Sequence, residues 1–301
     1  MYRSEKLYLT IDNIIPDSEV YPICIPSYNR PEAKLLKELK RNGNGLRVIL
    51  FVRKEQYELY SQYSDVFKIV KLKNVANIGQ TRNAIVRYCV KSRIPKIFML
   101  DDDINLCEFI VPSITSGGHK ALRPYCTHKG SSYKVNKYFF KMWMWYLSKA
   151  STKVSISSAG RKRDWWGMQW ADAQPIYNSG SVIQCVCVNV KLLHKHGINY
   201  RDSDICGIED YAIQYDCMRA GLYTLIIKDL VYDCPTMGRT EGGCDYSEGV
   251  EKVMRKRMKL FMENVIGKET DLVTTKETMS GIPSVRFKWG KFRVKETEKV
   301  W

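Results

Sequence analysis

Three consecutive aspartates, Asp101, Asp102 and Asp103, follow a short apolar run at residues 97–100. A run of this length and composition is typical of a buried strand in an α/β sheet. Ligands of such sheets bind outside the carboxyl ends of the strands, where these carboxylates would lie. Adjacent carboxylates repel one another, but a divalent cation between them offsets the repulsion, and Mg²⁺ and Mn²⁺ prefer oxygen ligands. The pattern indicates a metal site, with a solvated acidic turn as the alternative.

A second set of side chains combines positive charge with flat aromatic rings. Its members are Arg161, Lys162, Arg163, Trp165, Trp166 and Trp170 in one segment, and Arg286, Lys288 and Trp289 in a tail that alternates apolar and basic residues. Cations neutralise phosphates and aromatic rings stack on bases, so both segments favour contacts to nucleic acid. Tryptophan also stacks on sugars and fills cores, which leaves a sugar site and a packed core as alternatives.

The charge of the whole chain points the same way. Among its 301 residues, 48 Lys and Arg oppose 32 Asp and Glu, which gives a formal net charge of +16. Such an excess suggests a polyanionic partner, namely nucleic acid, an anionic membrane surface or an acidic polysaccharide, although a basic solvated surface would look the same. Because no apolar run is long enough to span a bilayer and no signal core follows Met1, we expect no membrane insertion and a cytoplasmic location. The ten scattered cysteines contain no C-x-x-C pair, which argues against a zinc cluster.

Elements that would position these residues follow from the hydrophobic pattern. Apolar runs predict strands at 21–26, 48–52, 67–72 and 97–100, separated by helices that begin near residues 31, 55 and 77. This alternation predicts a parallel α/β sheet with right-handed connections. Farther along, the pattern predicts helices at 135–150, 207–220 and 246–266 and strands at 182–190 and 223–227. We expect a catalytic domain at 1–240, and a C-terminal helix with a basic-aromatic tail at 241–301 that packs on it or extends it.

Four motifs occur in an order and spacing that resemble one enzyme family. They are the loop from Ile25 to Arg30, the turn from Asn77 to Asn83, the three aspartates, and the helix start from Gly207 to Tyr211. Together they resemble the GT-A glycosyltransferases, specifically the large inverting family that uses nucleotide sugars, over roughly residues 20–235. The resemblance implies a Rossmann-like, mostly parallel central sheet with flanking helices, followed here by a C-terminal helical and basic extension.

The resemblance implies a role for each matching residue on the donor side. The first loop would hold the base and ribose of the nucleotide, and the turn would approach the nucleotide or its diphosphate. The donor-binding residues implied in this way are Pro26, Ser27, Tyr28, Asn29, Arg30, Asn77, Gly79, Arg82, Asn83, Asp101 and Asp102.

A metal and a base are implied as well. Asp101 and Asp103 match the D-x-D pair whose Mn²⁺ or Mg²⁺ stabilises the charge of the departing diphosphate. All four histidines precede Asp210, so Asp233 is the available substitute for a late third ligand. Asp210, with Glu209 beside it, matches the catalytic base that takes the proton of the acceptor hydroxyl. Both acids could equally complement the dipole of a helix N-terminus.

A compact, basic enzyme of this kind is similar to the phage enzymes that glycosylate hydroxymethylated pyrimidines in DNA, including the TET-associated glycosyltransferases. This similarity implies a hexosyl- or pentosyltransferase that moves a sugar, with a UDP-sugar favoured, to 5-hydroxymethylcytosine or a related base. The expected setting is the cytoplasm of a phage-infected bacterium. Alternatives are a glycosyltransferase of surface polysaccharide or lipid, a haloacid-dehalogenase-like phosphatase, and a non-catalytic nucleic-acid-binding module.

Overall fold

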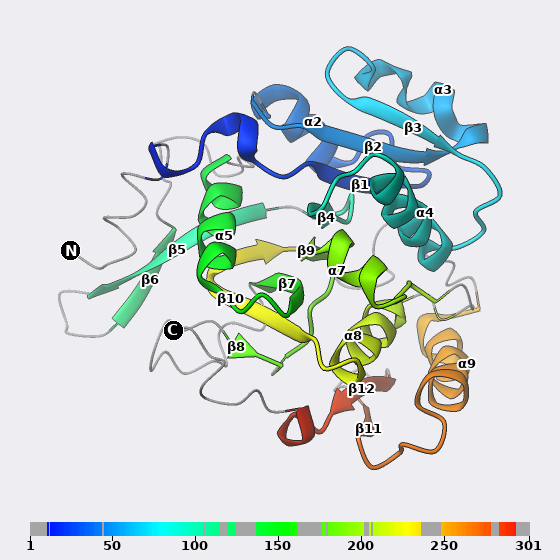
Figure 1. Ribbon diagram of the computed structural model, residues 1–301. Coiled ribbons are helices and arrows are strands. Elements are labelled where there is room, and N and C mark those ends of the chain that lie inside the picture. Colours follow the sequence, from blue (N-terminus) through cyan, green and yellow to red (C-terminus); the bar gives the residue numbers. More distant parts are fainter. Residues whose placement is uncertain are drawn as a thin grey trace.

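The computed structural model describes residues 11, 13–43, 45–104, 106–114, 120–124, 137–161, 176–178, 180–201, 205, 207–235, 248–277 and 283–292. For residues 106–114, 120–124, 176, 229 and 289 it describes the backbone alone. Figure 1 shows one large twisted sheet with helices packed along it. The predicted α/β class is confirmed.

The first half of the sheet consists of parallel strands in the spatial order β3-β2-β1-β4. These strands are β1 (Ile23–Ser27), β2 (Val48–Arg53), β3 (Lys68–Leu72) and β4 (Ile97–Leu100). Their connections contain α2 (Lys34–Asn42), the turns η2 (Lys54–Gln56), α3 (Tyr57–Tyr60) and η3 (Ser61–Tyr63), and α4 (Ile78–Lys91). The predicted alternation of strands and helices is confirmed, although the helix predicted near residue 55 is a series of short turns.

The second half of the sheet mixes parallel and antiparallel pairs. Its strands are β5 (Leu106–Ile114), β6 (Lys120–Pro124), β7 (Val154–Arg161), β8 (Ile176–Tyr177), β9 (Cys185–Val188) and β10 (Tyr223–Asp233). β9 lies antiparallel between β4 and β7, and β7 pairs in parallel with β10. The predicted strand at 182–190 is shorter because Gln184 has a φ of 60° and Asn189 caps the helix α7 (Val190–Lys195). β7 and the β5–β6 hairpin were not predicted.

Both faces of the sheet are buried under helices. Ile23 and Ile25 of β1 face a core that includes residues of α2 and of α5 (Lys137–Lys149), whereas Cys24 faces a core with residues of α4 and α7. This alternation has the period of two that a strand imposes on its side chains. Because both faces are apolar, the edge at the carboxyl ends of the strands is left for polar chemistry.

The C-terminal segment packs against α8 (Glu209–Arg219) on a third apolar cluster. Its elements are α9 (Val250–Phe261), η4 (Met262–Ile266), β11 (Val273–Glu277), β12 (Pro283–Phe287) and η5 (Trp289–Phe292). The turn η1 (Asp17–Glu19) belongs to the other end of the chain, where it precedes β1. Phe287 stacks on Tyr215 of α8 at 6.1 Å between ring centroids, and Tyr215 donates a hydrogen bond of 2.5 Å to Glu269. The alternating tail pattern therefore buries Val285 and Phe287 and leaves Arg286 exposed.

Within the described residues, no helix has both the length and the apolar character that a bilayer crossing requires.

Candidate active site

Acidic and basic side chains meet at the carboxyl edge of β1 and β4. Asp101 follows β4 directly, and its backbone N–H donates to the carbonyl of Gln184 at 2.9 Å. Helices α4 and α8 contribute Arg82, Glu209 and Asp210 to the same place. This is the edge at which ligands bind in parallel α/β sheets.

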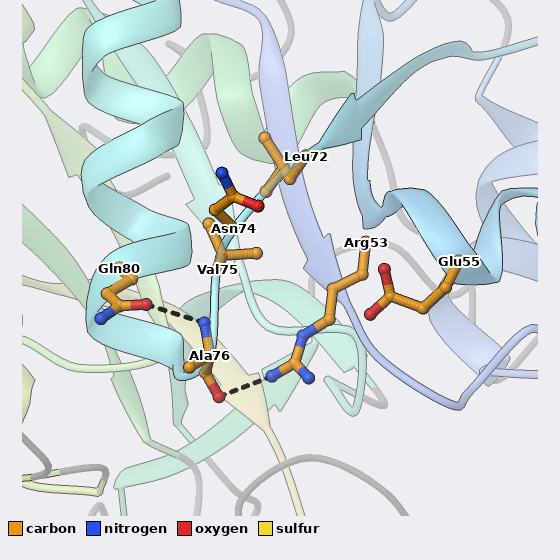
Figure 2. Close-up of a pocket in the computed structure, with 7 residues that line it drawn as sticks. All are labelled: Arg53, Glu55, Leu72, Asn74, Val75, Ala76 and Gln80. Carbon is orange, nitrogen blue, oxygen red and sulfur yellow. Dashed lines mark hydrogen bonds between the residues drawn. The ribbon is translucent and has the colours of Figure 1, made fainter.

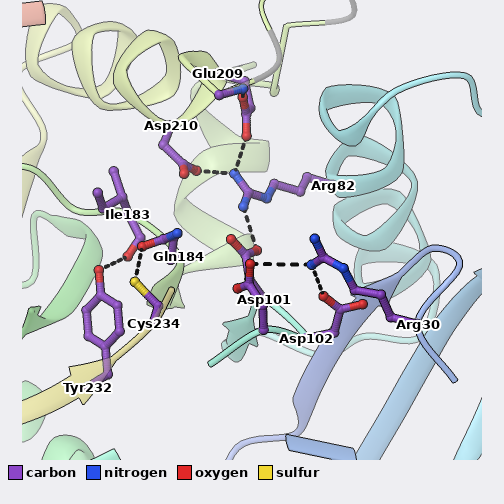
Figure 3. A network of polar contacts seen from close by, with 12 residues as sticks. Arg30, Arg82, Asp101, Asp102, Ile183, Gln184, Glu209, Asp210, Tyr232 and Cys234 are labelled. Carbon is purple, nitrogen blue, oxygen red and sulfur yellow. Dashed lines mark hydrogen bonds and ion pairs between the residues drawn. The ribbon is translucent and has the colours of Figure 1, made fainter. Parts of the chain in front are cut away.

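Arg82 connects three carboxylates from two other elements, as Figure 3 shows. Its Nη2 donates to Asp101 at 2.7 Å, and its Nη1 donates to Glu209 at 2.8 Å and also to Asp210. The guanidinium is buried and planar, so its position fixes all three acids relative to one another. The guanidinium of Arg82 therefore links the predicted metal ligand Asp101 with the predicted base Asp210.

A second arginine holds the other two aspartates. Arg30 donates through Nη1 to Asp102 at 2.8 Å and to Asp103 at 3.3 Å. Ser27, at the end of β1, donates to the second oxygen of Asp102 at 2.5 Å. Tyr60 supports this arrangement, since its hydroxyl contacts the Ser27 hydroxyl at 2.8 Å and accepts the backbone N–H of Arg30 at 2.9 Å. Asp102 is thus held by protein groups and faces inward.

Burial changes the ionisation of these acids. It raises the pKa of Asp210 to about 8, with Glu209 and Asp101 adding to the effect and Arg82 opposing it. Burial, together with Asp101 and Asp102, raises the pKa of Asp103 to about 7. Burial also raises the pKa of Asp102 and of Glu209. Two groups that titrate near neutral pH at a strand edge are typical of a site that moves protons or binds cations.

The carboxylates of this group offer oxygen atoms that suit a cation. The Oδ1 atom of Asp103 is buried and has no hydrogen-bond partner among the described residues, which suits a cation ligand. In the part of the chain that the structure describes, no group of three His, Cys, Asp or Glu side chains is close enough to bind a metal alone, and Asp233 at the end of β10 does not complete one. Mg²⁺ is often bound by one or two carboxylates together with waters and substrate phosphates, so Asp101 and Asp103 fit such a site.

The loop after β1 contacts Arg53, one of the residues that line a cavity. Tyr28 lies under the guanidinium of Arg53, whose Cζ is 4.0 Å from the ring centroid. Asn29 has a φ of 56°, and its backbone N–H donates to Gln56 at 3.1 Å. A cavity of about 520 Å³ begins at Arg53; its lining residues are Arg53, Glu55, Leu72, Asn74, Val75, Ala76 and Gln80 (Figure 2). The loop thus presents an aromatic ring and polar groups beside a cavity.

The predicted turn at residue 77 is a helix start. Asn77 caps α4, since its side chain accepts the backbone N–H of Gln80 at 2.9 Å. Gly79 is required for packing because a Cβ there would run into the carbonyl oxygen of Arg201. Asn83 donates to the carbonyl of Tyr200 at 2.6 Å. Gly79 and Asn83 therefore dock the start of α4 on the segment before α8, and Arg82 is directed into the site from there.

The predicted acceptor residues are only partly described. Lys162, Arg163, Trp165, Trp166 and Trp170 lie outside the described residues, as does the side chain of Trp289. Arg161, at the end of β7, donates to the sulfur of Cys234 at 3.4 Å. Arg286 and Lys288 are exposed on the C-terminal segment.

Several residues of the site were not predicted from the sequence. Gln184 and Cys234 flank Asp101 and Asp210, and Tyr60 and Arg53 support the loop after β1. None of them stands in a motif. Only Arg53 could have been found from its position, because it directly follows a predicted strand and ligand contacts gather at the carboxyl ends of parallel strands.

Residues 21–243 match the family described as "TET-Associated Glycosyltransferase", which identifies the protein as a glycosyltransferase. The chain belongs to this TET-associated family, as the motifs had indicated. The match also decides against the phosphatase alternative. No curated protein matches the chain significantly in sequence.

Solved structures resemble the chain more distantly. A structure titled as GalNAc-T7 with UDP, GalNAc and Mn²⁺ has a TM-score of 0.44 and 12% identity, and covers 84% of this chain and 57% of its own. A mannose-1-phosphate geranyltransferase from Thermus thermophilus has a TM-score of 0.38 and 8% identity, covering 71% and 75%. A CMP:2-keto-3-deoxy-manno-octonic acid synthetase complexed with CTP has a TM-score of 0.40 and 11% identity, covering 81% and 99%. The chain thus spans little more than half of the GalNAc-T7 structure, and at these TM-scores no likeness carries an argument about the site.

Proposed function

We propose that this glycosyltransferase moves a sugar from a UDP-sugar to the hydroxyl of a 5-hydroxymethylpyrimidine in DNA, by an inverting displacement that depends on a divalent cation. The observation that carries the proposal is the Arg82 guanidinium, which ties Asp101 of the donor side to Asp210 of the acceptor side. A displacement needs this arrangement because the leaving group and the attacking hydroxyl lie on opposite sides of one carbon.

Asp210 is the proposed base. As the acceptor oxygen forms its bond to the anomeric carbon, Asp210 takes the hydroxyl proton, and the bond between that carbon and the diphosphate oxygen breaks. The electron pair of the broken bond leaves with the nucleoside diphosphate, so inversion follows from attack on the opposite face. A carboxylate whose pKa is raised to about 8 is a better proton acceptor than an ordinary one near neutral pH.

The donor would extend from the cavity at Arg53 toward Asp101. Tyr28 and the polar lining of the cavity suit a nucleoside, which offers one flat ring and several hydrogen-bonding groups. Asp101 and Asp103 would hold the cation, which supplies positive charge to the departing diphosphate. Arg30 and Ser27 would keep Asp102 and Asp103 in place while the diphosphate binds.

DNA is the proposed acceptor because of charge. The chain carries a net charge of +16, and Arg286 and Lys288 of the C-terminal segment are exposed. Contacts of these residues to phosphates would make binding sensitive to salt. The basic tryptophan segment from Arg161 to Trp170 would contact the modified base, and the reaction would take place in the cytoplasm of a phage-infected bacterium.

The test uses labelled nucleotide sugars with hydroxymethylated and unmodified DNA. Label should enter only the hydroxymethylated DNA, because an unmodified pyrimidine has no hydroxyl at that position. Replacing Asp210 by asparagine (Asp210→Asn) should lower turnover by about 10²–10⁴-fold, the usual contribution of a general base. Asp216→Asn, on the same helix, is the matched control, since Asp216 pairs with Arg201 outside the site. Transfer to an oligosaccharide or lipid but not to DNA would refute the proposed acceptor.

The cation is tested by donor binding alone. Asp103→Asn should abolish the increase in UDP affinity that Mn²⁺ produces, because it removes one of the two carboxylates that would hold the cation. Isothermal titration calorimetry with and without Mn²⁺ measures the effect, with Asp216→Asn again as control. Equal enhancement by Mn²⁺ in the wild type and in Asp103→Asn would contradict this role.

A further inference from the structure

Gln184 has a backbone conformation that glutamine seldom adopts. Its φ is 60°, in the left-handed region, and it directly precedes β9. A side chain at this φ brings its Cβ too close to the backbone, so only glycine, and to a lesser degree asparagine and aspartate, adopts it without much cost. Strained residues persist where the surrounding contacts fix them, and they gather at functional sites.

The peptide groups of Gln184 contact two acids of the site. Its carbonyl accepts the backbone N–H of Asp101 at 2.9 Å. Its backbone also lies close enough to the carboxylate of Asp210 to lower the pKa of that group. One residue therefore contacts the end of β4 and the start of α8, which are more than a hundred residues apart in the sequence.

The side chain of Gln184 is anchored away from these acids. Its Oε1 accepts the thiol of Cys234 at 3.0 Å, and the sulfur of Cys234 accepts Arg161 Nη2 at 3.4 Å. The preceding residue is held as well, since the carbonyl of Ile183 accepts the Tyr232 hydroxyl at 3.0 Å. Figure 3 shows the contacts of Gln184 with Cys234 and of Ile183 with Tyr232 on the side of Asp101 that faces away from Arg30. Tyr232 of β10 and Cys234 shortly after it thus hold the strained peptide through groups other than the two acids.

We propose that Gln184 is a positioning residue, whose left-handed peptide holds Asp101 and Asp210 in register while its carboxamide, bound to Cys234, keeps that peptide in place. The proposal rests on the proposed function in so far as Asp210 is the base. It assigns a reason for the strain, because a glycine would satisfy the backbone but would leave the peptide free to turn.

Two substitutions separate strain from positioning. Gln184→Gly removes both the strain and the anchor, so its melting temperature should equal or exceed that of the wild type while its kcat falls by about ten- to a hundredfold, as expected for a small misplacement of catalytic groups. Gln184→Asn tolerates the left-handed φ and keeps a carboxamide, so it should restore most of the kcat.

Hydrogen exchange at the Asp101 amide provides a readout that does not depend on the reaction. This amide should exchange faster in Gln184→Gly than in the wild type, and at nearly the wild-type rate in Gln184→Asn. Unchanged exchange in Gln184→Gly would overturn the proposal, whatever the kcat, and so would faster exchange with an unchanged kcat. If the wild type transfers no sugar to hydroxymethylated DNA, the proposed function fails. Even then, faster exchange of the Asp101 amide in Gln184→Gly, with recovery in Gln184→Asn, still supports the positioning role of Gln184.

Discussion

Replacement of Arg82 by methionine (Arg82→Met) should destabilise the protein strongly at alkaline pH and much less at acidic pH. Methionine retains the apolar bulk of the arginine stem, so the main loss is the charge. The three carboxylates that share the guanidinium are Asp101, Glu209 and Asp210, whose side chains are 21%, 4% and 13% exposed. With the cation removed, these acids would remain buried together without a positive partner.

The magnitude follows from the burial of this group. Removing one partner of a buried ion pair costs about 3–5 kcal/mol, because the remaining charge is neither solvated nor paired. Arg82 also lowers the pKa of Asp210 and of Glu209, so both pKa values rise further in the variant. The folded variant then binds more protons than its unfolded chain from about pH 4 upward, and its free energy of unfolding falls as the pH rises through that window. We expect a loss of about 4 kcal/mol near pH 9 and a clearly smaller loss near pH 5.

Urea denaturation followed by circular dichroism measures both values. The matched control is Arg201→Met, because Arg201 forms a two-point ion pair with Asp216 but its side chain is 40% exposed. That variant should lose no more than about 1 kcal/mol at either pH. A loss in Arg82→Met that is the same at both pH values, or no larger than that of the control, would refute the account of Arg82 as the neutralising partner of three acids.

Two further predictions concern stability. In the wild type, burial raises the folded-state pKa of Asp103 from 3.8 to about 7 and that of Asp210 from 3.8 to about 8. The free energy of unfolding should therefore fall as the pH rises from about 4 to 8. Urea titrations that show a rise over this range would contradict these shifts. Gly79→Ala should lower the free energy of unfolding by about 1–3 kcal/mol, because the added Cβ would clash with the backbone of Arg201. The control Gly160→Ala, whose added Cβ would have only ordinary contacts, should lower it less. Equal losses of stability in thermal denaturation would exclude the clash.

The first half of the fold was predictable because its strands are continuous apolar runs. Residues 48–52 and 97–100 have no polar member and are buried on both faces, so their sequence reports their environment directly. β7 was missed because its serines give it a polar appearance. In the structure these serines are buried and paired: Ser157 accepts the indole N–H of Trp143 at 2.8 Å, and Ser155 donates to the carbonyl of Tyr223 at 3.0 Å. Such pairing depends on residues from other elements and leaves no local pattern.

The site was predictable where a carboxylate follows a strand or begins a helix. Asp101 and Asp210 were found in this way, and the structure brings them together through Arg82. The sequence indicated a metal between the aspartates but did not show that two arginines offset their charge as well. Arg30 lies 72 residues before Asp102, so no local pattern connects them. Gln184 was not predictable either, since a left-handed φ at a non-glycine residue results from tertiary contacts.

The ion pairs of Arg82 also have a consequence for the order of events during synthesis. Its partners Glu209 and Asp210 are made 127 and 128 residues after it, so the emerging chain must carry this guanidinium for a long time without them. Until α8 leaves the ribosome and docks, Arg82 has only Asp101 as a partner, and water has to solvate the part of the guanidinium that later meets Glu209 and Asp210. A ribosome-bound chain that ends before α8 should therefore remain sensitive to protease at the start of α4, and protection should appear only when residues beyond Arg219 have emerged.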